Sequence, residues 1–395
     1  MIKRFLLLLL LLQSVLSPAQ NWTSLPDFPG SARDDASGFI LGNNFYAGTG
    51  LDGGFNATSD FYVFDLVNET WSTGTSLPIG MERQYASGFS VGNAGYIFGG
   101  IGPGSTYLND LWKFDPGTST WTSLSPMPAS GRRGTSVFVI GNEVYFTGGH
   151  NATQGTLNDT WKYNTLTDTW TSTGTFPFSS FWRGSGCAIN GTGYLLSGID
   201  SANHYIEEMY SYNPTTNTWT LFQQMPTLAR GYCPLLAIGN ELCFYGGYNP
   251  AQGYFNDLFR YDLQLNAFVP YSGPPALGRR GFVAGVWNNT IYITTGLLST
   301  PARTTETWKV NGIVSLTEPE NPSSKIYPNP FAEYLQLPEN GELEIIDLAG
   351  RKIINTSVVA GKFNTSFLQK GMYLIRFTND QSMVKTELFF CSGTE

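Results

Sequence analysis

Apolar and polar positions alternate along most of this chain in a pattern that repeats about every 49 residues. Each repeat contains short apolar runs separated by turn residues, as at 137–140 and 144–147, which flank a turn at 141–143. Runs of this length with turn residues between them are typical of antiparallel strands. No stretch shows the 3.6-residue period of an amphipathic helix. The pattern therefore predicts an all-β protein.

Three sets of residues mark the repeat independently of one another. The first is an aromatic residue at Trp22, Trp71, Trp121, Trp170, Trp219 and Phe268. The second is a pair of small residues that ends at Gly50, Gly100, Gly149, Gly198, Gly247 and Gly296. The third is an acidic residue ten positions later, at Asp60, Asp110, Asp159, Glu208, Asp257 and Glu306. Because one four-stranded unit cannot bury its own faces, six of them in a row predict a six-bladed β-propeller.

The sixth repeat lacks the outer strand with which each of the others ends, since no Trp occurs near residue 317. A strand of the right kind is available at the start of the chain, in residues 21–24 around Trp22. We therefore predict that this N-terminal strand pairs into the last repeat. Such pairing closes the ring and leaves no exposed sheet edge.

The combination of small-residue pair, Asn-Asp pair and spaced Trp resembles the kelch repeat. The Asn-Asp pairs that carry this resemblance are Asn109-Asp110, Asn158-Asp159 and Asn256-Asp257. The resemblance covers about residues 21–312 and implies a kelch-type propeller. It does not define a function, because kelch propellers include enzymes, lectin-like binders and protein-interaction modules.

The first residues have the layout of a secretory signal peptide. Lys3 and Arg4 precede an apolar run at 5–12, and small residues precede a cleavage site between Ala19 and Gln20. The apolar run is too short to cross a bilayer, which needs about 20 residues. We therefore predict that residues 1–19 are removed and that the mature chain is exported.

The C-terminal segment has a different pattern from the repeats. After a propeller predicted at 20–313, a Pro- and Ser-rich linker at 314–325 leads to short strands with Gly turns, which predict a small β-sandwich at 326–395. Three motifs here resemble the sorting domain of the bacterial type IX secretion system. Their residues are Tyr327, Pro328, Asn329, Pro330, Asp347, Gly350, Arg351, Gly371 and Tyr373. The resemblance implies that this machinery carries the protein to the cell surface or releases it.

Composition narrows the classes of partner. The chain has 22 Lys and Arg against 30 Asp and Glu, a net charge of −8, whereas proteins that bind nucleic acid need concentrated basic charge. No later stretch is apolar and long enough to span a membrane. The four cysteines, Cys187, Cys233, Cys243 and Cys391, are expected to be buried thiols. We predict a monomer that holds no metal or cofactor and binds no nucleic acid.

Candidate binding residues gather in the loops on one face of the predicted ring. In five repeats an arginine lies seventeen residues before the last Gly of the small pair, and in the fourth repeat Phe181 takes this place. Guanidinium groups suit carboxylates and phosphates, and aromatic rings beside polar groups suit sugars. The predicted ligand-binding residues are Arg33, Arg83, Arg132, Arg183, Arg230, Arg279, Trp182, Tyr232 and Tyr248. The alternative is that the arginines bond loop carbonyls or acidic neighbours and have a structural role.

Two functions remain open from the sequence. The first is a secreted or surface-attached module that binds a glycan or a protein through this face. The second is a sugar-acid isomerase similar to the six-bladed kelch epimerase of N-acetylneuraminate, which needs an acid–base group near a carboxylate-binding arginine. Glu82 and His204 are the candidates for that group. Neither of the two histidines belongs to a metal-ligand motif or accompanies a nucleophile motif.

Overall fold

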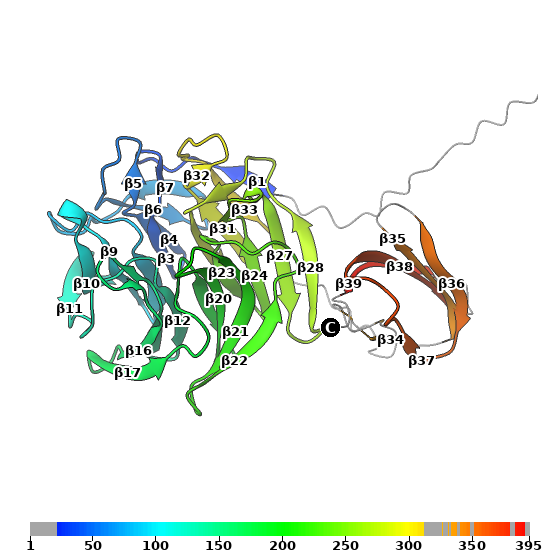
Figure 1. The fold of residues 1–395 in the computed structure, drawn as a ribbon. Helices are drawn as coiled ribbons and strands as arrows, with labels where there is room; N and C mark the ends of the chain where they lie inside the picture. The colour runs from blue at the N-terminus through cyan, green and yellow to red at the C-terminus, as the bar shows by residue number, and fades with distance from the viewer. Residues whose placement is uncertain are drawn as a thin grey trace, which may run out of the picture.

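The computed structural model describes residues 22–311, 326, 331, 333–337, 340–347, 351–379 and 384–391. These residues form strands, turns and one short 3-10 helix, η1(Pro103–Ser105), and they contain no α-helix (Figure 1). The prediction of an all-β fold is confirmed. The predicted cleavage site at Ala19 and Gln20 and the predicted linker at 314–325 lie outside the described residues.

Six antiparallel sheets follow one another along residues 22–311, and we call them blades 1 to 6. Blades 1 and 2, from the innermost strand outward, are β3(Ser37–Leu41), β4(Asn44–Gly48), β6(Phe61–Asp65), β7(Thr70–Thr73) and β8(Ser87–Val91), β9(Ala94–Ile101), β10(Tyr107–Asp115), β11(Thr120–Leu124). Blades 3 and 4 are β12(Ser136–Ile140), β13(Glu143–Thr147), β16(Asp159–Asn164), β17(Thr169–Thr175) and β19(Ser185–Ile189), β20(Thr192–Asp200), β21(Tyr205–Asn213), β22(Thr218–Gln224). Blades 5 and 6 are β23(Leu235–Ile238), β24(Glu241–Tyr245), β27(Asp257–Asp262), β28(Ala267–Ser272) and β30(Val283–Trp287), β31(Thr290–Thr294), β33(Thr307–Val310), β1(Trp22–Leu25).

Short strands extend the loops of the blades. Four pairs of two-residue strands are β2(Arg33–Asp34) with β5(Leu51–Asp52), β14(His150–Asn151) with β15(Gly155–Thr156), β25(Tyr248–Asn249) with β26(Gly253–Tyr254), and β29(Arg279–Arg280) with β32(Leu297–Leu298). In blade 4, β18(Phe181–Trp182) pairs with the end of β20. Four of the nine predicted binding residues, Arg33, Trp182, Tyr248 and Arg279, lie in these short strands.

The blades form a closed ring around one central cavity. The innermost strands, β3, β8, β12, β19, β23 and β30, line the cavity, and each contacts the next around the ring. The N-terminal strand β1 pairs antiparallel with β33, with Trp22 opposite Val310. This pairing confirms the prediction that the start of the chain completes the last sheet.

The recurring Trp residues join neighbouring blades. The indole N–H of Trp121 donates to the carbonyl oxygen of Thr75 at 2.8 Å, and that of Trp170 donates to the carbonyl oxygen of Ser125 at 2.7 Å. The Trp121 ring also packs on Phe61 of blade 1, with ring centroids 5.1 Å apart. The period seen in the sequence therefore corresponds to one contact made repeatedly between adjacent sheets.

The C-terminal residues form two further sheets (Figure 1). One pairs β34(Tyr334–Leu337) with β37(Gly361–Asn364), and the other has the order β36(Lys352–Val358), β35(Gly341–Asp347), β38(Gly371–Asn379), β39(Val384–Cys391). Side chains from both sheets, such as Leu335 and Ile345, belong to one hydrophobic cluster. This core is separate from the clusters of the blades.

Part of the predicted sorting motif lies in these sheets. Arg351 and Asp347 form an ion pair at 2.7 Å after β35, and the Arg351 backbone N–H donates to the same carboxylate at 2.9 Å. Gly371 begins β38, and the buried Tyr373 donates its hydroxyl to the carbonyl oxygen of Gln369 at 3.0 Å. Tyr327, Pro328, Asn329, Pro330 and Gly350 lie outside the described residues.

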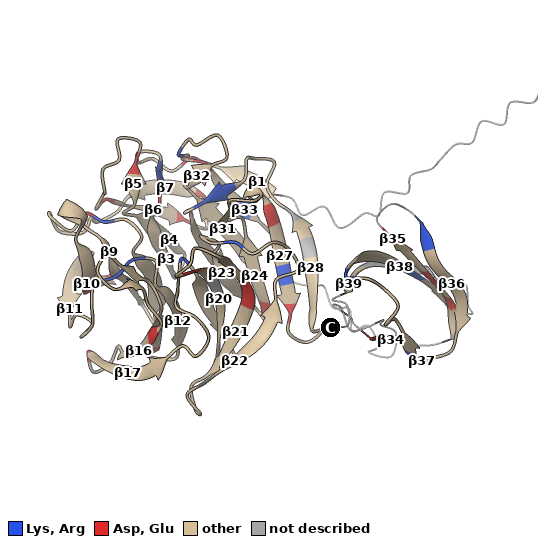
Figure 2. Ribbon diagram, viewed as in Figure 1, with Lys and Arg blue, Asp and Glu red and all other residues tan. Residues whose placement is uncertain are grey.

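Disulfide bonds do not stabilise this protein. All four cysteines are free, and burial raises the pKa of the Cys233 thiol to about 12. In Figure 2 charged residues are sparse along the strands, and most of the ribbon is neither acidic nor basic. Among the described residues, no helix has the length and apolar character needed to cross a bilayer. Non-covalent contacts therefore hold the ring together, and the apolar core and the backbone pairing are a large part of them.

Candidate functional site

The five arginines that recur at the predicted position are buried inside the blades. Their exposure is 0–1%, and each guanidinium binds the recurring acidic residue of its own repeat. In blade 2, Arg83 donates to the two carboxylate oxygens of Asp110 at 2.8 and 2.9 Å and to the carbonyl oxygen of Gly99 at 3.2 Å. The equivalent pairs are Arg33 with Asp60, Arg132 with Asp159, Arg230 with Asp257, and Arg279 with Glu306.

This geometry supports the structural alternative to the predicted ligand role of these arginines. A guanidinium that is buried and doubly bonded to a carboxylate has no free edge to offer a ligand. A buried charge also needs its partner, because an unpaired one is costly. The structure thus favours the structural alternative for Arg33, Arg83, Arg132 and Arg230, which bond both carboxylate oxygens. Arg279 is equally buried, but it makes one bond to Glu306 and one to the carbonyl oxygen of Thr295.

A different position of the repeat, two residues later, lines the central cavity. Its six members, which we call the inner belt, are Asp35, Tyr85, Gly134, Arg183, Tyr232 and Gly281. All have a φ between 52° and 61°, in the left-handed region. Each of the first five donates its backbone N–H to the carbonyl oxygen of the preceding belt member, at 2.7–3.1 Å, with Asp35 donating to Gly281. Left-handed φ is costly for Asp, Tyr and Arg, and such strain concentrates at functional sites.

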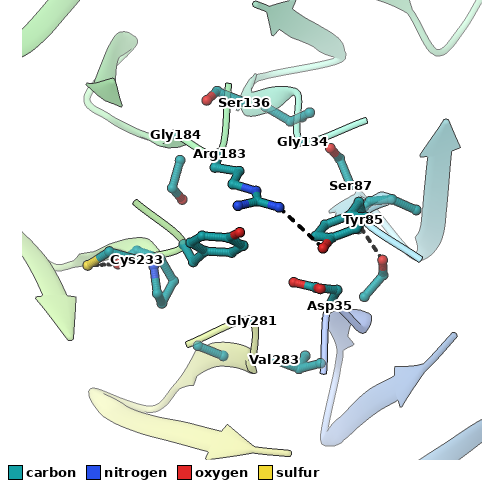
Figure 3. A pocket seen from close by; sticks show the side chains of 18 of the residues that line it. Asp35, Tyr85, Ser87, Gly134, Ser136, Arg183, Gly184, Cys233, Gly281 and Val283 are labelled. Carbon is teal, nitrogen blue, oxygen red and sulfur yellow. Dashed lines mark hydrogen bonds between the residues drawn. The ribbon is translucent and has the colours of Figure 1, made fainter. Parts of the chain in front are cut away.

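The cavity inside the inner belt has a volume of about 280 Å³. Asp35, Tyr85 and Arg183 point toward one another across it (Figure 3). The Nη2 group of Arg183 donates to the Tyr85 hydroxyl at 3.2 Å. The pocket therefore holds one acid, one phenol and one guanidinium close together.

Guanidinium groups and aromatic rings alternate beside this pocket, in the order Arg133, Trp182, Arg183, Tyr232 and Arg280, and we call this group the mouth of the pocket. Arg183 lies between the rings of Trp182 and Tyr232, 3.8 and 3.7 Å from their centroids. Arg133 lies 4.5 Å from the Trp182 centroid, and Arg280 lies 4.3 Å from the Tyr232 centroid. Each of the two rings thus contacts two cations, which fixes the guanidinium groups by cation–π attraction. Trp182 and Tyr232 contact arginine in this arrangement, where the sequence suggested surfaces for a sugar.

The pocket shifts the acidity of its own groups. Burial, followed by the charge of Asp34, raises the pKa of Asp35 to about 7, although Arg183 and Arg280 oppose the shift. Burial lowers the pKa of Arg183 to about 10, and burial next to Asp35 raises that of Tyr85 to about 12. Strongly shifted groups that share a pocket are typical of functional sites.

Several buried polar atoms at the pocket have no hydrogen-bond partner among the described residues. Those on residues that line the pocket are Nε of Arg183, Oγ of Ser136 and Oγ1 of Thr135, and those on residues beside it are Nε of Arg133, Nη1 of Arg280 and Nδ1 of His150. Buried polar groups are almost always satisfied in folded proteins. Several such atoms close together are unusual and mark this region as a candidate binding site.

The other predicted residues lie apart from Arg183. Glu82 accepts a hydrogen bond from the Gly80 backbone at 3.2 Å and does not line the pocket. The His204 side chain is 78% exposed and lies 3.3 Å from Asp200. Neither candidate acid–base group, Glu82 or His204, therefore lines the Arg183 pocket. Tyr248 is at the edge of the mouth, with its centroid 5.7 Å from the Arg280 guanidinium.

Sequence reasoning missed Asp35, Tyr85, Arg133 and Arg280. A signal was present, because the recurring arginine is followed by a second arginine at Arg133 and Arg280. Adjacent residues of an extended backbone project to opposite sides, so that Arg132 is buried in its blade while Arg133 contacts the Trp182 ring. Among the described residues, no group of three or more His, Cys, Asp or Glu could hold a metal ion.

Comparisons with known proteins agree with the architecture. Residues 35–229 match the family model described as the KLHDC2/KLHL20/DRC7 Kelch-repeats domain, and residues 325–389 match the Secretion system C-terminal sorting domain. A solved structure titled "Structure of YjhT" is similar, with 19% identity, a TM-score of 0.63, and coverage of 74% of this chain and 98% of that chain. At this identity the likeness shows the fold alone. No curated protein matches the chain.

Proposed function

Because the chain is a kelch-repeat protein that ends in a secretion-system sorting domain, we propose that it is an exported binding protein whose central pocket takes the acidic group of a glycan. The observation that carries this proposal is Arg183. Its guanidinium lines the pocket, is held between two rings, and keeps a buried Nε without a partner. Such a group is prepared to donate charged hydrogen bonds to a carboxylate.

The charges around the pocket support an anionic ligand. Three guanidinium groups, of Arg133, Arg183 and Arg280, surround the mouth in a chain whose overall charge is negative. Asp34 forms an ion pair with Arg303 at 2.6 Å, and burial raises the pKa of Asp35 to about 7, which lowers its negative charge near neutral pH. The mouth therefore keeps a positive balance.

The neutral groups support a glycan. Thr135 and Ser136 line the pocket and have buried hydroxyl oxygens without partners, so they suit a ligand rich in hydroxyl groups. A cavity of about 280 Å³ is near the lower limit of ligand pockets, which are about 300–1,000 Å³. This size fits one sugar ring at the end of a longer chain.

The test compares the full chain with its Arg183→Gln variant on an array of acidic and neutral glycans, followed by calorimetry of the acidic hits. We expect acidic glycans to bind, and the variant to lose at least tenfold in affinity, since a charged hydrogen bond contributes about 1.5–3 kcal/mol. Lys113→Gln, which removes the same charge from the outer strands, is the matched control. An array on which only neutral glycans bind would contradict the proposal.

A second candidate function, isomerisation of a sugar acid, is favoured by Asp35. Its pKa of about 7 suits a general acid or base, and it faces Arg183 in the same pocket. Incubation of the full chain with a single anomer of N-acetylneuraminate, followed by NMR, measures mutarotation. Acceleration that is lost in Asp35→Asn would favour this function over simple binding. A rate equal to that without protein would remove it.

A further inference from the structure

We propose that Arg133 and His150 form a second anion subsite beside the Arg183 pocket, so that the ligand is an oligosaccharide with acidic groups on neighbouring sugars. The inference rests on the proposed function and specifies its ligand. It assigns a binding role to two residues of blade 3 that the sequence pattern did not select.

The backbone fixes Arg133 against His150. The N–H of Arg133 donates to the carbonyl oxygen of His150 at 3.0 Å, and the N–H of His150 donates back at 2.9 Å. The imidazole lies 5.1 Å from the Trp182 centroid and 6.0 Å from the Tyr107 centroid. The Arg133 guanidinium contacts the same two rings, at 4.5 and 5.7 Å. Arginine, imidazole and two rings therefore make one compact group.

The new subsite adjoins the pocket. The guanidinium groups of Arg133 and Arg183 lie 4.5 and 3.8 Å from the Trp182 centroid, and 5.3 and 5.1 Å from the Tyr85 centroid. Because both guanidinium groups lie close to the same two rings, acidic groups on neighbouring sugars of one chain can reach both of them. Two acidic groups on adjacent sugars can therefore bind one guanidinium each, at Arg133 and at Arg183.

Nearby acidic and phenolic groups do not balance the charges of Arg280 and Arg133 equally. Asp35 acts on both Arg183 and Arg280, and Tyr254 also faces Arg280. Among the ion pairs formed by the described residues, none includes Arg133. Like charges held close together repel, and an anion placed between them relieves the repulsion. This difference favours Arg133 over Arg280 as the second subsite.

Unsatisfied atoms point to a polar occupant. Nε of Arg133 and Nδ1 of His150 are both buried without a hydrogen-bond partner. Burial, then the charges of Arg133 and Arg183, lowers the pKa of His150 below its ordinary value of 6.5, which favours the neutral ring. A neutral imidazole can donate to a carboxylate or accept from a sugar hydroxyl without adding charge. The subsite thus offers one cation and one neutral partner.

The test measures the affinity of the full chain for galacturonic acid and for its dimer and trimer by calorimetry. The variants are Arg133→Gln and Arg183→Gln, with Lys113→Gln as the charge-matched control. We expect the dimer to bind at least tenfold more tightly than the monomer. Arg133→Gln should remove this gain and leave monomer affinity within about twofold of the unaltered chain, whereas Arg183→Gln should weaken all three ligands.

Each result has a distinct meaning. Equal affinity for monomer and dimer, or an Arg133→Gln variant that weakens both alike, would overturn the second subsite and leave the pocket standing. Failure of all three acids to bind would overturn the pocket as well. Preference for an acidic peptide such as an oligoglutamate over the uronates would replace the glycan with a protein ligand. Near-identical thermal unfolding of the variants shows that any loss comes from the site.

Discussion

Two sets of arginines lie within a few residues of each other in this propeller, and their surroundings differ. Arg132 is buried and binds both oxygens of Asp159, at 2.6 and 2.8 Å. Arg133, its neighbour in sequence, has aromatic rings around it and no ion pair among the described residues. The residue type is the same, yet one side chain holds a blade together and the other faces the mouth.

This difference shows that the role of an arginine depends on the group that its guanidinium contacts. A carboxylate supplied by the same repeat uses both edges of the buried guanidinium. An aromatic ring attracts the cation through its face and leaves the N–H edges free. Blade 4 illustrates the exchange, because Phe181 replaces the buried arginine and packs on Phe176 at 5.0 Å. In that blade the arginine of the inner belt, Arg183, is kept for the pocket.

The largest expected effect comes from breaking a buried pair. Arg83→Met leaves Asp110 without its charged partner and should lower the free energy of unfolding by about 3 kcal/mol. Urea denaturation measures it. Arg183→Gln, in the same experiment, should change stability by less than about 1 kcal/mol, since burial already disfavours the Arg183 charge. Equal losses in the two variants would mean that both arginines are structural.

The two variants should have the opposite order of effect on ligand binding, with the larger loss in Arg183→Gln. For an acidic glycan, Arg183→Gln should lose about 1.5–3 kcal/mol of binding free energy. Arg83→Met should bind as the unaltered chain does, once the folded fraction is taken into account. Calorimetry at a temperature where both variants are folded provides the measurement. A loss of affinity in Arg83→Met would return the buried arginines to the binding site.

Because of Asp35, the affinity for an acidic ligand should depend on pH. Below about pH 7 its carboxyl is neutral, and above it the carboxylate repels an acidic ligand and offsets Arg183 and Arg280. Affinity should therefore fall several-fold as pH rises through 7, and Asp35→Asn should remove this dependence. Asp34, which faces the same group, is already paired with Arg303. Titrations at pH 6 and pH 8 test the prediction, and parallel pH profiles in the two proteins would contradict it.

The same carboxyl should affect folding without any ligand. Its pKa in the folded chain, about 7, is above the ordinary value of 3.8. Between these values the unfolded chain binds fewer protons than the folded one, so this group's contribution to stability falls as pH rises. The stability of Asp35→Asn relative to the unaltered chain should therefore increase from pH 4 to pH 7. A constant difference would show that Asp35 is ionised normally.

The smallest effect concerns salt. Binding at the mouth should weaken as ionic strength rises, because screening acts over about 8–10 Å near physiological salt. The buried pairs of the blades, of which Arg33 with Asp60 is one, should respond less. Affinity and melting temperature measured across one salt series separate the two sets. A melting temperature that falls as steeply as the affinity would remove the distinction.

The fold could be predicted because it depends on spacing. Trp121 and Trp170 recur at the repeat length and bond neighbouring blades, and Trp22 marks the strand that closes the last sheet. Each of these residues has one structural task that the period alone reveals. The sorting motif was likewise recognisable from its own sequence.

The site could be predicted only in part. Arg83 and Asp110 are both recurring positions, and a bond to an acidic neighbour was one of two alternatives, but their fixed separation of 27 residues was not used to choose between them. Which of two adjacent arginines faces the channel depends on strand parity, and short strands at the mouth leave that parity undetermined. Arg183 was selected because it departs from the register, and that departure was the informative signal.

The inner belt separates the shape of the backbone from the choice of side chain. Asp, Tyr, Gly, Arg, Tyr and Gly occupy its six positions with nearly the same φ, so one position can be exchanged while the frame persists. At Gly281 an added Cβ would lie 2.6 Å from the Asp35 carboxylate, but at Gly134 its nearest neighbour would be 3.2 Å away. Gly134 is therefore the less crowded of the two glycines, although a side chain there would keep a left-handed φ and would press on the backbone of Arg183.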